Sequence, residues 1–162
     1  MERIGQTYPD LLLVWCGGMD SSLETRKSYI LIEEYCPTVC AIYPHRRIFN
    51  LRDMVFAETC YDTVHRDAAR RDKYLSILDP IRGAKDEADM LETLLAYLID
   101  SDKSTAEAAE LLHVHESTVK YRLNKINRRL GYDITQMPAT YNLYLALTMK
   151  WLLDYQSGPA LV

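Results

Sequence analysis

Basic side chains gather in one short stretch of this otherwise acidic chain. Residues 113–132 contain five Lys or Arg residues and one acid, which gives the stretch a net charge of +4. The whole chain carries −4, so the remaining residues together carry −8. A confined basic stripe in an acidic protein is the charge pattern expected of a focused contact with phosphate groups. A solvated helix face remains the alternative when the charge is taken alone.

The same stretch has the spacing of a helix with one apolar seam and one polar face. At helical spacing the apolar residues fall within an arc of about 60°, which can dock on a core. They are Val119, Leu123, Ile126 and Leu130. The opposite face offers donors, acceptors and an aromatic ring, which could reach base edges. It consists of Ser117, Tyr121, Asn124 and Arg128, with Lys125 beside them. Lys120, Arg122 and Arg129 flank this face, where they could reach phosphates.

A short helix and a tight turn precede this long helix. Ser104 and Glu107 form a capping box that opens a helix ending at Leu112. A three-residue turn then leads into a helix over 116–130, which Gly131 ends. His113 in this turn tolerates a left-handed backbone, and His115 can cap the next helix. Small residues at 108 and 109 allow two helices to cross closely. This geometry is typical of a helix-turn-helix that places its second helix in the major groove. An ordinary helical hairpin with a basic outer face is the alternative.

The segment from Ala108 to Ile126, followed by Leu130-Gly131 and residues 145–147, resembles the C-terminal helix-turn-helix of the PucR/CdaR family of bacterial regulators. The resemblance implies binding to a promoter site on double-stranded DNA, usually as a dimer, and an upstream part that senses a small-molecule effector. This chain departs from the family at Glu116-Ser117, where the family often has Arg-Asn. Glu116 could accept a hydrogen bond from a cytosine amino group, or it could be a favourable charge on the helix dipole. The DNA-binding residues expected from the helix and the resemblance are Glu116, Ser117, Thr118, Lys120, Tyr121, Arg122, Asn124, Lys125, Arg128 and Arg129.

The first 80 residues predict a small α/β segment. An apolar strand over 11–16 precedes Gly17-Gly18, and a helix from about residue 21 to 35 stops before Pro37. Strands over 39–43 and 47–51 and a helix over 53–64 follow. Residues 10–64 resemble the end of the degenerate cyclase-like domain that often precedes the PucR module. We expect the division near 79–83, a DNA-binding module over 81–157 and a disordered tail over 158–162. The predicted fold is mainly α, with a helix-turn-helix of winged-helix-like or homeodomain-like type.

Two other segments could be interpreted as chemical sites. The turn Gly17-Gly18-Met19-Asp20-Ser21-Ser22 is similar to the signature of PP-loop ATP pyrophosphatases. Cys16 stands where that motif has serine, and too few residues follow for the βα units of such a fold. Cys36 and Cys40, with His45 nearby, do not have the spacing of a zinc site. We therefore expect no catalytic residue, cofactor or metal, and no enzymatic activity. An ATP-using enzyme and a protein-interaction module that does not bind DNA remain the alternatives.

The last predicted helix, from about residue 139 to 155, is apolar nearly all round. A small module would leave one such face uncovered, and uncovered apolar faces usually bind a partner. Leu143, Leu147 and Trp151 are therefore predicted to form the interface of a homodimer. The sequence has neither a signal peptide nor a membrane-spanning apolar run, so we expect a cytoplasmic protein with four reduced cysteines.

Overall fold

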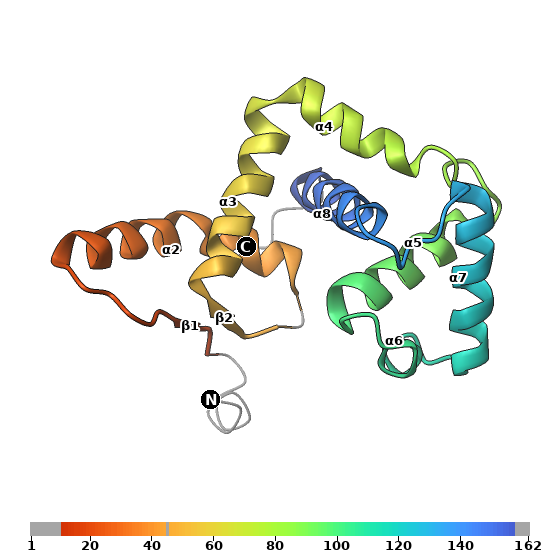
Figure 1. The fold of residues 1–162 in the computed structure, drawn as a ribbon, viewed down its shortest axis with the longest axis horizontal. Helices are drawn as coiled ribbons and strands as arrows, with labels where there is room; N and C mark the ends of the chain where they lie inside the picture. The colour runs from red at the N-terminus through yellow and green to blue at the C-terminus, as the bar shows by residue number, and fades with distance from the viewer. Residues whose placement is uncertain (1–10, 45, 158–162) are drawn as a thin grey trace. The chain divides into compact units, whose positions relative to one another are not determined.

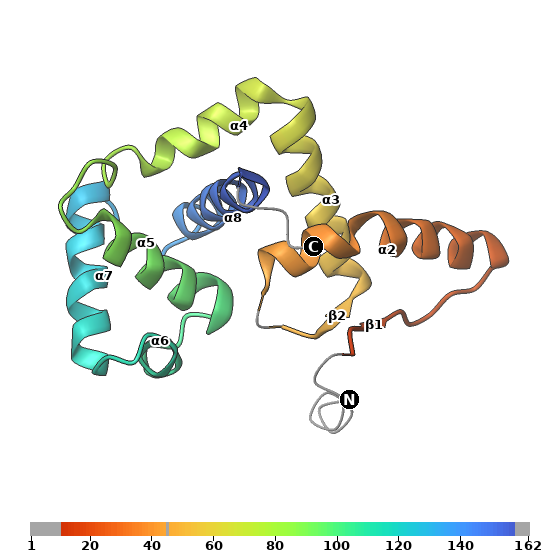
Figure 2. The ribbon, with the colours of Figure 1, turned by 180° about the vertical axis from the view of Figure 1, so that it is seen from behind.

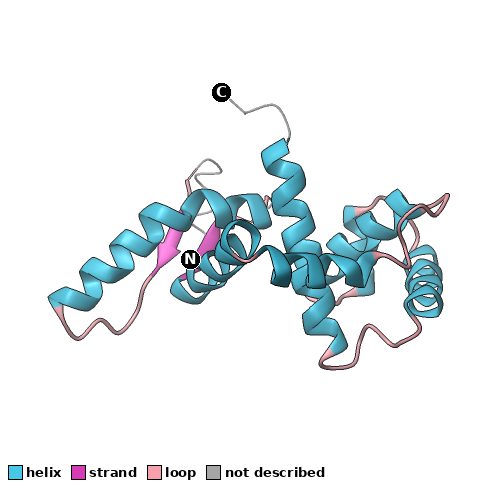
Figure 3. Ribbon diagram, turned by 90° about the horizontal axis from the view of Figure 1, so that it is seen from above, coloured by secondary structure: helices cyan, strands magenta, loops and turns pink. Residues whose placement is uncertain are grey.

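The computed structural model describes residues 11–44 and 46–157, so the predicted tail at 158–162 lies outside the described residues. The chain forms two compact units, here called unit 1 and unit 2. Unit 1 comprises the residues up to Arg66 together with those from Leu152 onward, and unit 2 comprises Asp67–Trp151. Helices dominate both units, as Figure 3 shows, which confirms the mainly α prediction. Among the described helices, none has both the length and the apolar character needed to cross a bilayer.

Unit 1 is built around one strand-helix-strand element (Figure 1). Strand β1 (Leu13–Trp15) and strand β2 (Ile48–Asn50) pair in parallel, with Val14 opposite Phe49. Helix α2 (Ser22–Ile42) connects them, and helix α3 (Leu51–Arg66) follows directly after β2. Ser21 caps α2, because its hydroxyl accepts a hydrogen bond from the backbone N–H of Glu24 at 3.2 Å. The predicted strands at both ends of this element are thus confirmed.

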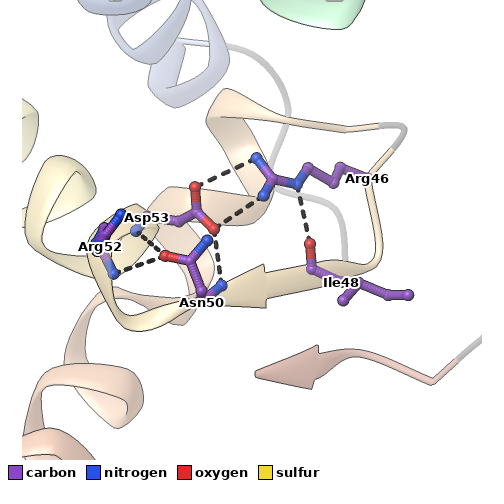
Figure 4. Close-up of polar contacts among 5 residues, drawn as sticks. All are labelled: Arg46, Ile48, Asn50, Arg52 and Asp53. Carbon is purple, nitrogen blue, oxygen red and sulfur yellow. Dashed lines mark hydrogen bonds and ion pairs between the residues drawn. The ribbon is translucent and has the colours of Figure 1, made fainter. Parts of the chain in front are cut away.

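The corner between β2 and α3 is fixed by side chains that satisfy the first backbone groups of α3 (Figure 4). The Asn50 side-chain oxygen accepts hydrogen bonds from the backbone N–H groups of Arg52 at 2.8 Å and of Asp53 at 3.3 Å. The Asp53 carboxylate accepts from the Asn50 backbone N–H at 2.7 Å and from both terminal nitrogens of Arg46. Arg46 also donates to the carbonyl of Ile48. These charged residues therefore hold the corner of unit 1.

Helix α2 continues through Pro37, which corrects two predictions. The sequence predicted a helix end before Pro37 and a strand over 39–43, but residues 38–42 are helical. Proline within a helix costs about 3 kcal/mol through a lost hydrogen bond and a steric clash. Val39 and Ile42 lie in the last turns of α2 and are fully buried. Burying each such side chain contributes about 1.5–3 kcal/mol, so packing outweighs the local penalty.

Unit 2 consists of helices packed around one apolar core, and its described residues contain no strand, so its helix-turn-helix has no wing. Its elements are α4 (Ala68–Leu75), the 3₁₀ turn η1 (Ser76–Leu78), α5 (Glu87–Leu95), the π-helical turn η2 (Ala96–Asp100), α6 (Thr105–Leu111), α7 (Glu116–Leu130) and the part of α8 (Ala139–Ser157) that ends at Trp151. Figure 2 shows α5, α6 and α7 from behind. Helix α7 packs against both α5 and α6.

The units divide at Arg66, whereas the sequence placed the division near residue 80. Leu78 and Ile81 explain the difference, because both are buried in the core of unit 2. The break at Asp79-Pro80 is therefore a turn inside this unit. Composition indicated the turn correctly, but it could not show which core the flanking apolar residues join.

Candidate nucleic-acid interface

The helix-turn-helix consists of α6, a four-residue turn and α7. The Ser104 hydroxyl caps α6 by accepting a hydrogen bond from the Glu107 backbone N–H at 3.2 Å. In the turn, His113 has a φ of 53°, in the left-handed region. Nδ1 of His115 accepts a hydrogen bond from the backbone N–H of Ser117 at 3.2 Å and so caps α7. The serine half of the predicted capping box, the left-handed His113 and the His115 cap are therefore confirmed, whereas the backbone N–H of Ser104 donates to the Ser101 carbonyl instead of to Glu107.

The apolar seam of α7 lies in the core of unit 2, as predicted. Val119, Leu123 and Ile126 are buried, and Leu130 packs against the core at the end of the helix. Ala108 and Ala109 on α6 are also buried. Helix α7 ends at Gly131, whose φ of 79° is the left-handed conformation that glycine adopts without strain. The core thus fixes how α7 is rotated about its axis.

This rotation exposes the four residues predicted to form the outer face of α7. Ser117, Tyr121, Asn124 and Arg128 are all exposed, and 61% of Tyr121 is accessible to solvent. Among the described residues, Arg128 forms no ion pair. The outer face therefore presents hydroxyl, phenol, amide and guanidinium groups.

The basic residues on the flank of α7 that faces α5 are engaged within the protein. Lys125 Nζ lies 2.5 Å from an oxygen of Asp86, and Arg129 lies 3.9 Å from the other oxygen. Arg122 donates to the hydroxyl of Thr93 at 3.2 Å and lies 3.4 Å from Asp89. Only 20% of the Arg122 side chain is exposed. The sequence predicted phosphate contacts for Arg122 and Arg129 and placed Lys125 beside the base-reading face, but the structure pairs each of the three with α5 or the residue before it.

The other flank of α7, next to α6, is arranged around Glu116. Its carboxylate accepts a hydrogen bond from the Thr105 hydroxyl at 2.6 Å and lies 2.8 Å from Lys120. These two partners hold the pKa of Glu116 below its usual range. Glu116 therefore links α7 to the start of α6. Thr118, from the predicted set, is half-buried.

Sequence analysis missed Asp86, Asp89, Thr93 and Thr105. Asp86 is 39 residues from Lys125 in the chain, so no local spacing could have indicated this pair. Hydrogen bonding and charge attraction from Lys125 lower the pKa of Asp86. Its carboxylate is therefore ionised at neutral pH.

The residues predicted to form a dimer interface do not share one exposed face. Leu143 and Leu147 are fully buried in the core of unit 2, and Trp151 is half-buried. The expectation that α8 leaves these leucines uncovered is wrong, because the other helices of unit 2 cover them. In this packing the two leucines are not accessible to a second copy of the chain.

The two alternative sites in unit 1 use their polar groups locally. The backbone N–H of Asp20 donates to the Glu24 carboxylate at 3.0 Å, so a phosphate would compete with this carboxylate. The cavity beside the turn is lined by the acidic residues Asp20, Glu24, Glu34 and Glu58 and by one lysine, Lys27. His45 lies outside the described residues. Among those described, no three His, Cys, Asp or Glu residues are grouped as metal ligands.

Comparison with known proteins places the helix-turn-helix in a family. Residues 90–149 match the model of the PucR C-terminal helix-turn-helix domain. The chain is 36% identical over 69 residues to the proline-responsive transcriptional activator PutR of Bacillus subtilis. The aligned region covers 41% of this chain and 16% of PutR. It is also 36% identical over 70 residues to the purine catabolism regulatory protein of the same organism, covering 43% of this chain and 13% of that protein. No solved structure matches the chain. The chain therefore carries a PucR C-terminal helix-turn-helix domain.

Proposed function

We propose that this chain is a sequence-specific DNA-binding transcription regulator and that α7 is its recognition helix. The main support is the outer face of α7, where Ser117, Tyr121, Asn124 and Arg128 are exposed on a helix whose rotation is fixed by a buried seam. The names of the two relatives describe them as an activator of transcription and a regulatory protein. The B-DNA major groove admits one α-helix, and its base edges offer acceptors and donors to such side chains.

We assign base reading to the outer face and phosphate contact to its edges. Arg128 suits a guanine, because a guanidinium can donate to two acceptors on the guanine edge. Asn124 suits an adenine, because a side-chain amide can donate to one group on the adenine edge and accept from another. Lys120 lies at the edge of the face, and 58% of its side chain is exposed despite its pairing with Glu116. Arg122 is reassigned from DNA contact to the packing of α5 against α7, because buried Thr93 holds its guanidinium.

We also propose that two chains bind one operator. A single recognition helix reads only a few base pairs, and paired helix-turn-helix modules read two half-sites about one helical turn apart. Because Leu143 and Leu147 are buried, we place the interface between the two chains on exposed residues. A small-molecule effector sensed outside residues 90–149 fits the name of PutR, which describes that protein as proline-responsive. Sedimentation of the chain with and without a two-half-site duplex tests the pairing, and a single chain per duplex would overturn it.

The experiment that tests base reading begins with selection of a preferred duplex from a random pool by the wild-type chain. Binding of this duplex and of a scrambled one is then measured by fluorescence anisotropy. Arg128→Ala should lose about 1–3 kcal/mol of discrimination between the two duplexes. Arg26→Ala is the matched control, because Arg26 is exposed on α2 in unit 1. Equal loss in both variants, or failure of the pool to yield any preferred sequence, would overturn the proposal.

A further inference from the structure

We infer that Asp86 is an internal counter-ion that competes with DNA phosphates for Lys125 and Arg129, and that it thereby weakens binding to non-cognate DNA. This inference rests on the proposed function. Asp86 lies 2.5 Å from Lys125 and 3.9 Å from Arg129, one carboxylate oxygen to each. A single carboxylate thus pairs with two of the five basic residues of α7.

The Asp86 carboxylate is oriented toward α7 and not toward its own helix. Asp86 occupies the N-cap position of α5, where aspartate usually accepts a hydrogen bond from a backbone N–H of its own helix. Its side chain makes no such bond and points to α7 instead. At the same position of α6, Ser104 does form the expected cap. The local preference of Asp86 is therefore given up in favour of the pair with Lys125.

The two cations that Asp86 holds, Lys125 and Arg129, can exchange partners. The side chains of Lys125 and Arg129 are 37% and 38% exposed, and both are long enough to turn toward solvent. Lys125 also lies next to the outer face on the helix surface. Arg122 differs, because it is 20% exposed and donates to the buried Thr93 hydroxyl. The flank therefore holds one fixed cation and two exchangeable ones.

The pairing of Asp86 with Lys125 and Arg129 should weaken non-specific DNA binding. Such binding gains its free energy from neutralised phosphates and released counter-ions. A phosphate that takes Lys125 or Arg129 only replaces the Asp86 carboxylate and then faces its negative charge. Base reading by the outer face is not reduced in this way. Asp86 would thus lower affinity for all sequences while it preserves the difference between the cognate sequence and others.

Asp86→Asn tests the inference, because it removes the charge and keeps the size of the side chain. Anisotropy titrations of the full chain use the selected and the scrambled duplex at several salt concentrations. The variant should bind the scrambled duplex about tenfold more tightly at low salt, and its salt slope should steepen by about 2. The affinity for the selected duplex should rise by the same factor, so the discrimination ratio should stay unchanged. Asp89→Asn is the matched control, because it removes the same charge beside the fixed Arg122 and should change the slope little.

A triple variant and a folding measurement complete the test. Adding Lys125→Ala and Arg129→Ala to Asp86→Asn should return the salt slope to the wild-type value. Weaker binding of both duplexes by a folded Asp86→Asn variant would overturn the inference, since Asp86 would then position the cations for DNA. Equal effects of Asp86→Asn and Asp89→Asn would overturn it too, because only net charge would matter. If wild type prefers no sequence, the proposed function fails instead.

Discussion

Replacing Arg122 by alanine separates a structural role from a DNA contact. The hydrogen bond to Thr93 involves a charged donor, and such bonds contribute about 1.5–3 kcal/mol. At 3.2 Å it lies at the long end of the usual range, which favours about 1.5 kcal/mol. Asp89 is 57% exposed, so its ion pair with Arg122 adds about 0.5 kcal/mol or less. Arg122→Ala should therefore lower the free energy of unfolding by about 2 kcal/mol.

Urea unfolding followed by Trp151 fluorescence, in a Trp15→Phe background, measures this loss near the core of unit 2. A loss of about 2 kcal/mol corresponds to a fall in Tm of about 4–8 °C for a chain of this size. In a second series, Thr93→Val removes the hydroxyl but keeps the shape. Arg122→Ala should cost about 1.5 kcal/mol less in that background, because the coupled partner is already absent.

The DNA titration supplies the refuting result. If Arg122 braces α5 against α7, the alanine variant should keep the wild-type salt slope under conditions where it is fully folded. An unchanged urea midpoint together with a salt slope reduced by about 1 would show that Arg122 binds a phosphate. The reasoning from its burial and its Thr93 partner would then be refuted.

Three further predictions concern local features. Ser104→Ala removes the cap of α6 and should lower the free energy of unfolding by about 1 kcal/mol; an unchanged urea midpoint would contradict this. Burial raises the pKa of Cys60 to about 12, so at pH 8 its thiol should resist iodoacetamide while half-exposed Cys16 reacts; mass spectrometry showing equal rates would refute this. ATP with magnesium should not shift Tm, because Glu24 already occupies the Asp20 amide; stabilisation that Asp20→Ala abolishes would restore the enzyme alternative.

The helix-turn-helix could be predicted because its signals are local. Caps at Ser104 and His115, the left-handed His113 and the seam that includes Ile126 each depend on residues within a few positions of one another. Their energies also agree with the fold, so no distant contact overrides them. The outer face of α7 follows from the seam by helical geometry alone. This part of the candidate interface was therefore accessible without a structure.

The errors share one cause, which is that distant burial or pairing decided the outcome. Pro37 should end a helix on local grounds, but burial of Val39 and Ile42 continues it. Leu147 should be uncovered in an apolar helix, but the core of unit 2 covers it. Periodicity shows that a face is apolar and does not show whether the same chain covers it. These questions needed the structure.

The basic residues of α7 show most directly how a local sequence pattern differs from pairing between distant residues. Five basic residues on α7, each neutralising one phosphate, would give a salt slope of about −4.5 for one recognition helix. The structure fixes Arg122 on Thr93 and holds Lys125 and Arg129 on Asp86. This leaves Lys120, which is exposed although it pairs with Glu116, and Arg128, whose charge also offsets neighbouring phosphates while it reads a base. We therefore expect a wild-type slope of about −2 for each helix, measured as the logarithm of the binding constant against that of salt concentration. A slope near −4.5 would mean that DNA opens the pairs with α5 and that free charge cannot be counted from the unbound chain.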